Sequence, residues 1–130
     1  MKRKSRIDER FEEIARVKAE QICILPGVLD DISLSGCKVH FPNPISLDME
    51  NDYEISVDFA NTELKDTLKL LVHPQWQSAD SSETVIGFKI LCSPDTPKLK
   101  AVIELLKSLK DDDSKNISSL IINSSANIIQ

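Results

Sequence analysis

The chain has 130 residues, of which 41% are hydrophobic and 28% are charged, proportions typical of one globular domain rather than of a disordered or fibrous protein. Its net charge of -5 excludes the broad basic surface of a general DNA- or RNA-binding protein. No stretch approaches the ~20 apolar residues of a membrane-spanning helix, so we expect a cytoplasmic protein without membrane insertion. Three widely spaced cysteines, Cys23, Cys37 and Cys92, favour buried reduced thiols over a disulfide framework.

Residues 1–15 are predicted to form a flexible N-terminal arm. The first ten residues carry five basic side chains against two acidic ones, although the protein as a whole is acidic. A small anion would therefore find a local cationic segment. Ile7, Phe11 and Ile14 follow helical spacing, so a short amphipathic helix is an alternative for part of this arm.

Short β-strands are predicted from the end of the arm onward. Strict alternation places Tyr53, Ile55, Val57 and Phe59 on one buried face, and Pro26-Gly27 is the predicted turn of the first hairpin. The full set of predicted strands is 15–25, 28–32, 37–41, 53–59, 67–73 and 84–91. Short strands at this spacing are typical of an all-β sandwich or barrel.

The pattern changes at Thr96-Pro97, which are predicted to be the N-cap and the first residue of a helix. The apolar residues that follow at helical spacing are Leu99, Val102, Ile103, Leu106 and Leu109. We expect this stripe to cover one end or face of the barrel, completing a domain over residues 16–110. Residues 111–130 are rich in Ser and Asn and predict a mobile tail, with docking of their Ile and Leu residues as the alternative.

Two short motifs surround the first predicted strand: an Arg-x-x-x-Arg formed by Arg6 and Arg10, and an Asp-x-Ser-x-x-Gly formed by Asp31, Ser33 and Gly36. Each alone is common, the first in charged segments and the second in turns. In this order, and followed by a barrel-like pattern, the two motifs resemble those of the PilZ domain family.

This resemblance covers residues 6–107 and includes Val72–Trp76 and Ile86–Phe88, which are similar to later strands of that family. It implies a mainly β fold, a six-stranded antiparallel β-barrel with a C-terminal α-helix. It also implies a single-domain receptor for cyclic di-GMP, with no further cofactor. Because only five residues precede Arg6, we expect the ligand to order the arm and so alter binding of an unknown protein effector, as in motility, chemotaxis or biofilm-type signalling.

The motif residues suit the chemistry of this ligand. The guanidinium groups of Arg6 and Arg10 stay charged, bind phosphate oxygens or the guanine O6/N7 edge, and stack on bases. The carboxylate of Asp31 can accept the N–H protons of the opposite guanine edge, and the hydroxyl of Ser33 can add a hydrogen bond. Gly36 is expected to allow a positive φ or a close approach of backbone to ligand.

Other interpretations of the same residues remain open. The acidic spacer Asp8-Glu9 can neutralise the arm, which favours a PilZ-like interaction protein that binds no nucleotide. Asp31, Ser33 and Gly36 can instead form a turn whose polar side chains satisfy the local backbone. A single-stranded nucleic-acid binder is disfavoured, because only 5% of the residues are aromatic.

The remaining chemistry-bearing residues indicate neither a metal site nor an enzyme. On a strand, the odd separation of Cys37 and His40 directs them to opposite faces. His73 is predicted to be a packed or barrel-rim histidine. Trp76 is predicted to be a core or rim aromatic, with base stacking as the alternative. No arrangement of nucleophile, base and stabilising groups is present in the sequence.

Overall fold

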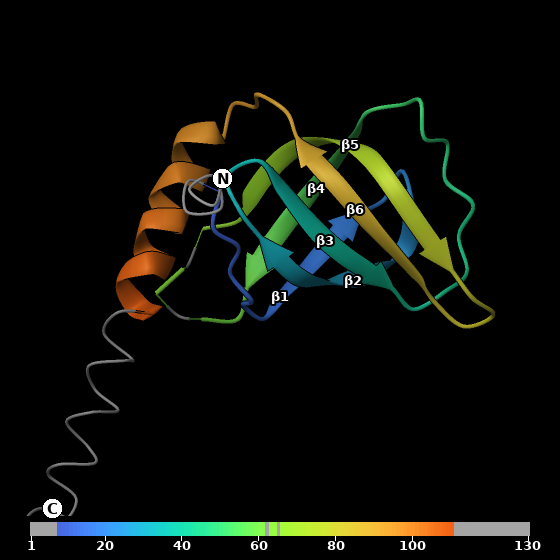
Figure 1. The fold of residues 1–130 in the computed structure, drawn as a ribbon, viewed down its shortest axis with the longest axis horizontal. Helices are drawn as coiled ribbons and strands as arrows, with labels where there is room; N and C mark the ends of the chain where they lie inside the picture. Colours follow the sequence, from blue (N-terminus) through green and yellow to red (C-terminus); the bar gives the residue numbers. More distant parts are fainter. Residues whose placement is uncertain (1–7, 62, 65, 111–130) are drawn as a thin grey trace, which may run out of the picture.

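The computed structural model describes residues 8–61, 63–64 and 66–110, and six antiparallel strands within them close into a barrel (Figure 1). The strands are β1 (Ala15–Ala19), β2 (Cys23–Ile32), β3 (Gly36–Phe41), β4 (Tyr53–Phe59), β5 (Leu68–Ala79) and β6 (Thr84–Ile90). Their order around the barrel is β1-β2-β3-β6-β5-β4, and β1 pairs with β4 to complete the closure. The predicted six-stranded antiparallel barrel is therefore confirmed.

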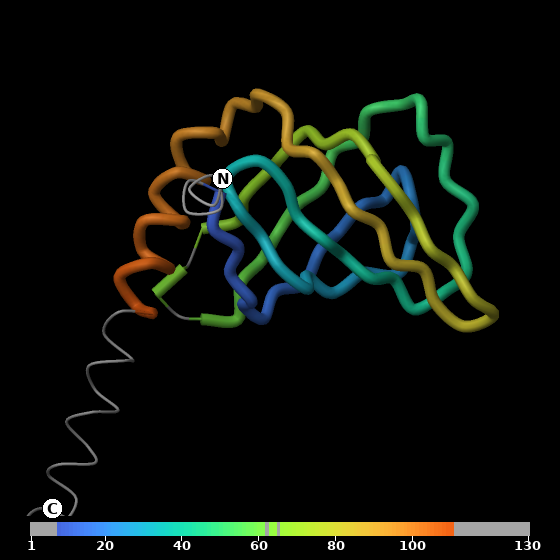
Figure 2. Tube along the Cα trace, viewed as in Figure 1, coloured from blue at the N-terminus to red at the C-terminus, as the bar shows by residue number. Residues whose placement is uncertain are grey.

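A helix over residues 96–110 lies across one end of the barrel, beside the N-terminal segment (Figure 2). Its buried side chains are Leu99, Ile103 and Leu106, which join the barrel interior in one hydrophobic cluster. Val102 and Leu105 pack against that cluster from the helix flank. Burial of this stripe removes apolar surface from water and fixes the helix to the barrel end, as its periodicity predicts.

The barrel interior is formed by the alternate residues of each strand. Tyr53, Ile55 and Val57 of β4 are buried and Phe59 is half-buried, which confirms the face predicted for this strand. β1 shows the same alternation of buried and exposed residues. This period of two is what a strand with one face toward a core and one toward water produces.

The predicted turn at Pro26-Gly27 is wrong, because both residues lie inside β2. The chain turns earlier, where the Ile22 N–H donates to the Ala19 carbonyl at 2.8 Å. Pro26 instead lies where the pairing of β1 and β2 changes register between Val17 and Ala19. Such an irregular pairing tolerates proline, since a residue at a bulge does not need to donate a ladder hydrogen bond.

The helix begins one residue earlier than predicted. The carbonyl of Asp95, rather than that of Thr96, accepts the first helical hydrogen bond, from the Leu99 N–H at 2.9 Å. The Thr96 hydroxyl accepts from the Ser93 N–H at 2.9 Å and so stabilises the preceding turn. The Asp95 carboxylate accepts the Lys69 N–H at 2.8 Å, which ties the start of the helix to β5.

Residues 8–14 run as an extended segment rather than the alternative amphipathic helix. Phe11 and Ile32 exchange two backbone hydrogen bonds, of 2.8 and 3.0 Å, and the Phe11 ring is 6% exposed within the core. Pairing with β2 therefore determines the path of this segment. The rest of the predicted flexible arm, residues 1–7, and the predicted mobile tail, residues 111–130, lie outside the described residues.

The three cysteines are free thiols, but they differ in exposure. Cys37 is buried as predicted, whereas Cys23 is half-buried and Cys92 is exposed, so the expectation that all three are buried is wrong. Cys92 follows the last strand, where the chain leaves the barrel surface.

The histidines lie on the outside of the barrel. His40 contacts Asp30 at 2.7 Å from the face opposite to Cys37, and His73 is a half-exposed residue of β5 that contacts Asp52 at 2.9 Å. Both placements agree with the sequence predictions. Among the described residues, no three His, Cys, Asp or Glu side chains gather as metal ligands, and no helix there has the length and apolar character to cross a membrane.

Candidate functional site

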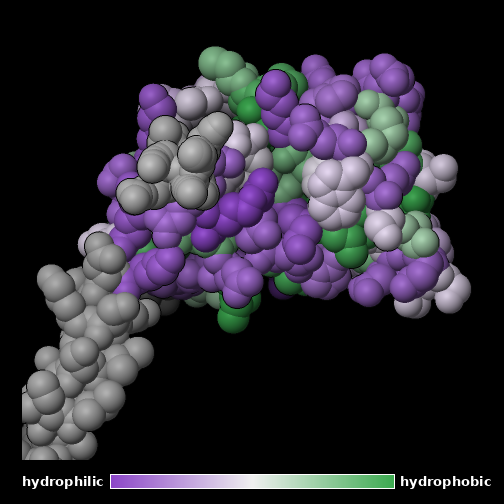
Figure 3. All heavy atoms as spheres, in the orientation of Figure 1, coloured by the Kyte–Doolittle hydropathy of each residue, from purple (hydrophilic) through white to green (hydrophobic). Residues whose placement is uncertain are grey.

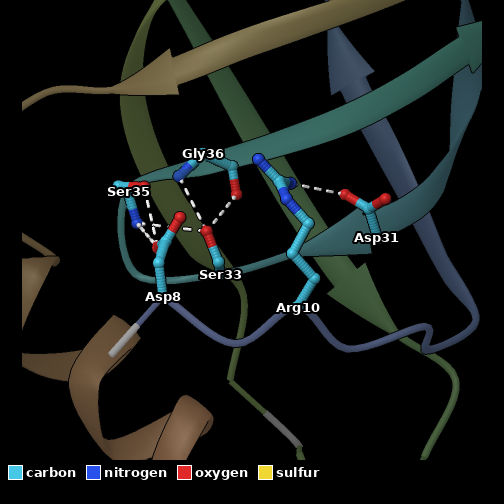
Figure 4. Close-up of polar contacts among 6 residues, drawn as sticks. All are labelled: Asp8, Arg10, Asp31, Ser33, Ser35 and Gly36. Atoms are coloured by element: carbon cyan, nitrogen blue, oxygen red, sulfur yellow. Dashed lines mark hydrogen bonds and ion pairs between the residues drawn. The ribbon is translucent and has the colours of Figure 1, made fainter. Parts of the chain in front are cut away.

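The Asp-x-Ser-x-x-Gly motif forms the tight turn between β2 and β3 (Figure 4). The Ser33 N–H donates to the Gly36 carbonyl at 2.8 Å, and the Ser33 hydroxyl oxygen accepts the N–H groups of Gly36 at 3.1 Å and Ser35 at 3.3 Å. Ser33 is fully buried. The Ser33 hydroxyl therefore stabilises the turn between β2 and β3. Direct contact between Ser33 and a ligand stays a prediction.

Gly36 is required by the space around it rather than by its backbone torsion. None of the three glycines has a positive φ, so that part of the expectation for Gly36 is wrong. A Cβ on Gly36 would lie 2.7 Å from the Phe88 carbonyl oxygen of β6 and 3.4 Å from Nη2 of Arg10. The missing side chain thus lets β6 approach and leaves room for the guanidinium.

Replacing Gly36 by alanine should destabilise the fold by about 1–3 kcal/mol, because the contact at 2.7 Å is with rigid backbone and β3 must shift. The shift should also displace the Arg10 guanidinium. Urea denaturation measures the first effect. Leu34→Ala is a suitable control, since Leu34 is an exposed residue of the same turn, and equal stability of both variants would contradict the close-approach explanation.

Arg10 and Asp31 join the two motifs, although 21 positions separate them in the chain. Nη1 of Arg10 donates to Oδ1 of Asp31 at 2.7 Å, and the two side chains are 48% and 18% exposed. Arg10 precedes Phe11, whose pairing with β2 brings the N-terminal segment over the turn (Figure 4). The structure therefore unites Arg10, Asp31 and Gly36 in one site. Arg6, the remaining predicted site residue, lies outside the described residues.

The acidic spacer does not neutralise Arg10 in this structure. Oδ1 of Asp8 accepts the Ser35 hydroxyl at 2.8 Å and the Ser35 N–H at 3.3 Å, while Oε2 of Glu9 contacts Nζ of Lys110 at 2.7 Å. Ser35 was not predicted as a site residue, and its position inside the turn motif is the only sequence signal for it. Asp8 thus fastens the segment to the turn, and Glu9 fastens it to the helix.

A row of side chains extends from Asp31 across the outer surface of the barrel. Asp31 pairs with Lys38, Lys38 with Gly87, and Gly87 with Trp76, so the row crosses β2, β3, β6 and β5. Trp76 is 46% exposed, and a Cβ on Gly87 would lie 2.2 Å from its Nε1, so the indole covers this glycine. Lys89, the partner of Gly36, lies in the neighbouring row. The face of the molecule shown in Figure 3 is mostly hydrophilic.

Cys37 lies in the core close to this site. Burial raises the pKa of its thiol from 9.0 to about 12, the negative charge of Asp31 adds to the rise, and the positive charge of Arg10 opposes it. A thiol with so high a pKa stays protonated and unreactive. Cys37 therefore supplies packing beneath the ion pair rather than chemistry.

In the folded protein, a thiol reagent such as DTNB should modify the exposed Cys92 rapidly and Cys37 only after unfolding.

The raised pKa of Cys37 also has a consequence for stability. Between pH 9 and about 12 the unfolded chain loses the Cys37 proton while the folded protein keeps it, so the free energy of unfolding falls as pH rises. Cys37→Ala should show a smaller fall in this range, and an identical profile would contradict the assignment.

Comparison with known proteins shows a similarity of fold. No family model and no curated protein matches the sequence. Among solved structures, the crystal structure of the Borreliella burgdorferi PlzA protein in complex with c-di-GMP is similar, with a TM-score of 0.50 and 17% sequence identity. The fold is PilZ-like. The similarity covers 81% of this chain but 46% of PlzA, so the chain spans less than half the length of that protein, and at this identity the similarity concerns the fold.

Proposed function

We propose that the chain binds cyclic di-GMP on the outer surface of the barrel, where the segment before β1 crosses the β2–β3 turn. The contact of 2.7 Å between Arg10 and Asp31 carries this proposal, because it joins the two sequence motifs at one exposed position. The PilZ-like fold supports it, since the similar PlzA structure is a complex with c-di-GMP.

Binding is proposed to proceed by exchange of ion-pair partners. An ion pair at the protein surface contributes about 0–1 kcal/mol, and the Arg10 side chain is 48% exposed, so a ligand group can replace either partner of the Arg10–Asp31 pair at small cost. Arg10 then binds a phosphate or the O6/N7 edge of a guanine, and Asp31 accepts the N1–H and amino protons of a guanine. Lys38 lies next to Asp31 and adds positive charge for the phosphates. The exposed indole of Trp76 offers a face on which a base can stack.

The signal to an effector is proposed to pass through the N-terminal segment. Arg6 is four residues before Arg10, and we propose that it binds the opposite side of the ligand and draws the arm across the barrel. Glu9 lies between these arginines and contacts Lys110 of the helix. A shift of the segment would therefore alter the surface at the helix end, where an effector can detect it.

An interaction protein that binds no nucleotide is the second candidate. It is favoured by the contacts that these side chains already make without a ligand. Arg10 forms an ion pair with Asp31, Asp8 accepts hydrogen bonds from Ser35, and Glu9 forms an ion pair with Lys110. On this alternative the contacts are structural and have no need of a ligand.

Isothermal titration calorimetry with cyclic di-GMP separates the two candidates. The proposed receptor should give a saturable heat signal, and cyclic di-AMP should give none at the same concentrations, because adenine presents an amino group in place of the guanine O6 acceptor. A flat trace with cyclic di-GMP, on protein shown to be folded by circular dichroism, would reject nucleotide binding and leave the interaction protein.

A further inference from the structure

Exposed apolar side chains gather on the outer surface of β1 and β2, away from the residues that contact Arg10. Ile24 is 87% exposed, Ile14 is 74% exposed, and Leu25 and Val28 are nearly half exposed. With Pro26 they form what we call the β1–β2 face. Ile14, Pro26 and Val28 also line a shallow hollow of about 470 Å³ beside Phe59. Large apolar residues gathered in this way indicate an interaction surface.

The β1–β2 face has an acidic end before Ile14 and carries basic side chains along β1, where Arg16 lies beside Val28. Glu12 and Glu13 lie on one side of Ile14, and Arg16 and Lys18 project from β1 on the other side. Within the described part of the chain, none of these four charged side chains has an ion-pair partner.

Neighbouring charges modify this pattern without reversing it. Asp30 and Lys38 lie near Glu12 and Glu13, and the Asp30 carboxylate is already paired with His40. Asp58 lies opposite Arg16 on β4, and its carboxylate accepts a hydrogen bond from the Thr67 hydroxyl. The acidic end therefore stays acidic, and Arg16 and Lys18 remain available to a partner.

We propose that the β1–β2 face is a homodimer interface, with a second copy of this chain as its occupant. In a two-fold interface residue i of one copy meets residue j of the other, and j meets i. An axis near Ile14 and Val28 would bury the apolar residues of both copies and place Glu13 of each copy against Arg16 of the other. A surface with opposite charges on the two sides of such an axis complements itself in this way. The inference goes beyond nucleotide binding and does not depend on it.

Sedimentation equilibrium of the 130-residue chain tests the proposal. The wild type should be a dimer whose dissociation is concentration-dependent, and Ile14→Glu should weaken the dimer by at least about tenfold, because it buries a charge at the centre of the interface. Leu71→Glu is the matched control, since Leu71 is an exposed apolar residue on β5, outside this face. Circular dichroism verifies that each variant is folded.

A charge exchange distinguishes a specific interface from loss of folding. Glu13→Arg and Arg16→Glu should each weaken the dimer, and the double variant should restore it, because the pair is re-formed in the opposite sense. A wild-type chain that is monomeric at all concentrations would overturn the proposal. So would a dimer that Ile14→Glu leaves intact. A monomer that dimerises only after removal of residues 111–130 would assign the face to those residues instead.

Discussion

Replacing Arg10 or Asp31 by alanine is expected to weaken cyclic di-GMP binding roughly 30-fold to several thousand-fold, which corresponds to a loss of about 2–5 kcal/mol. Each variant removes a charged contact to the ligand, and the ligand group that made this contact is left without its partner. The Asp31 variant should show the larger effect, because Asp31 is 18% exposed and Arg10 is 48% exposed. Titration calorimetry measures both affinities.

The ion pair between Arg10 and Asp31 also allows a prediction for the variant in which both residues are replaced by alanine. Because the ligand must break this pair to bind, and either single variant already removes that cost, the loss in the double variant should exceed the sum of the single losses by the energy of the pair, about 0–1 kcal/mol. Lys69→Ala and Asp66→Ala are charge-matched controls at exposed positions on and before β5, outside the site. Unchanged affinity in either single variant would remove that residue from the binding site.

Replacing Phe11 by alanine should lower the free energy of unfolding by about 3–5 kcal/mol and the melting temperature by more than about 10 °C. The ring is buried, and the Lys110 ammonium lies 5.6 Å from its centre, so its removal opens a cavity between the N-terminal segment and the helix. Loss of the ring should also release Arg10 from its position above Gly36. Thermal denaturation followed by circular dichroism measures the stability change.

Leu34→Ala is the control for the Phe11 variant, because Leu34 is an exposed apolar residue of the neighbouring turn and its removal should change stability little. A Phe11 variant as stable as the wild type would show that the segment does not depend on the barrel for its position. That result would favour the flexible arm predicted for residues 1–15. A destabilised variant would show that Phe11 is part of the folded core.

The strands were predictable where one face is buried and the other is solvated. Tyr53–Phe59 alternates strictly, since its inward residues fill the barrel and its outward residues meet water. The apolar stripe of the helix was predictable for the corresponding reason, with a period close to 3.6. Both patterns depend on residues that are close in the chain, so they can be recognised in a single sequence. The pairing of β1 with β4 links distant segments, and periodicity alone does not indicate which strands meet.

Pro26-Gly27 shows where a local signal has two meanings. Proline and glycine interrupt a regular ladder either by turning the chain or by bulging a strand, and only the register of β1 against β2 selects the bulge. The extended conformation of residues 8–14 could not be predicted from the sequence either. Helical spacing of apolar residues was overridden there by backbone hydrogen bonds between Phe11 and Ile32.

In the site, the sequence motifs indicated which residues converge but not how. Arg10, Asp31 and Gly36 lie together, and their contact with a ligand stays a prediction. That Gly36 makes room for the backbone of β6, and that Ser33 is engaged by its own turn, depends on contacts that no spacing reveals. The partners of Asp8 and Glu9 lie 27 and 101 positions away, beyond the reach of any local pattern.

Closure of the barrel limits how any partner can recognise this protein. Because β1 pairs with β4, every strand among the described residues has a neighbour on both sides. Along these paired lengths a partner cannot extend the sheet by adding a strand of its own, whereas the half of β5 after Val72 pairs with β6 alone. Recognition over the paired strands must rely on side chains, so single substitutions on that surface should be able to separate one partner from another while leaving the fold intact.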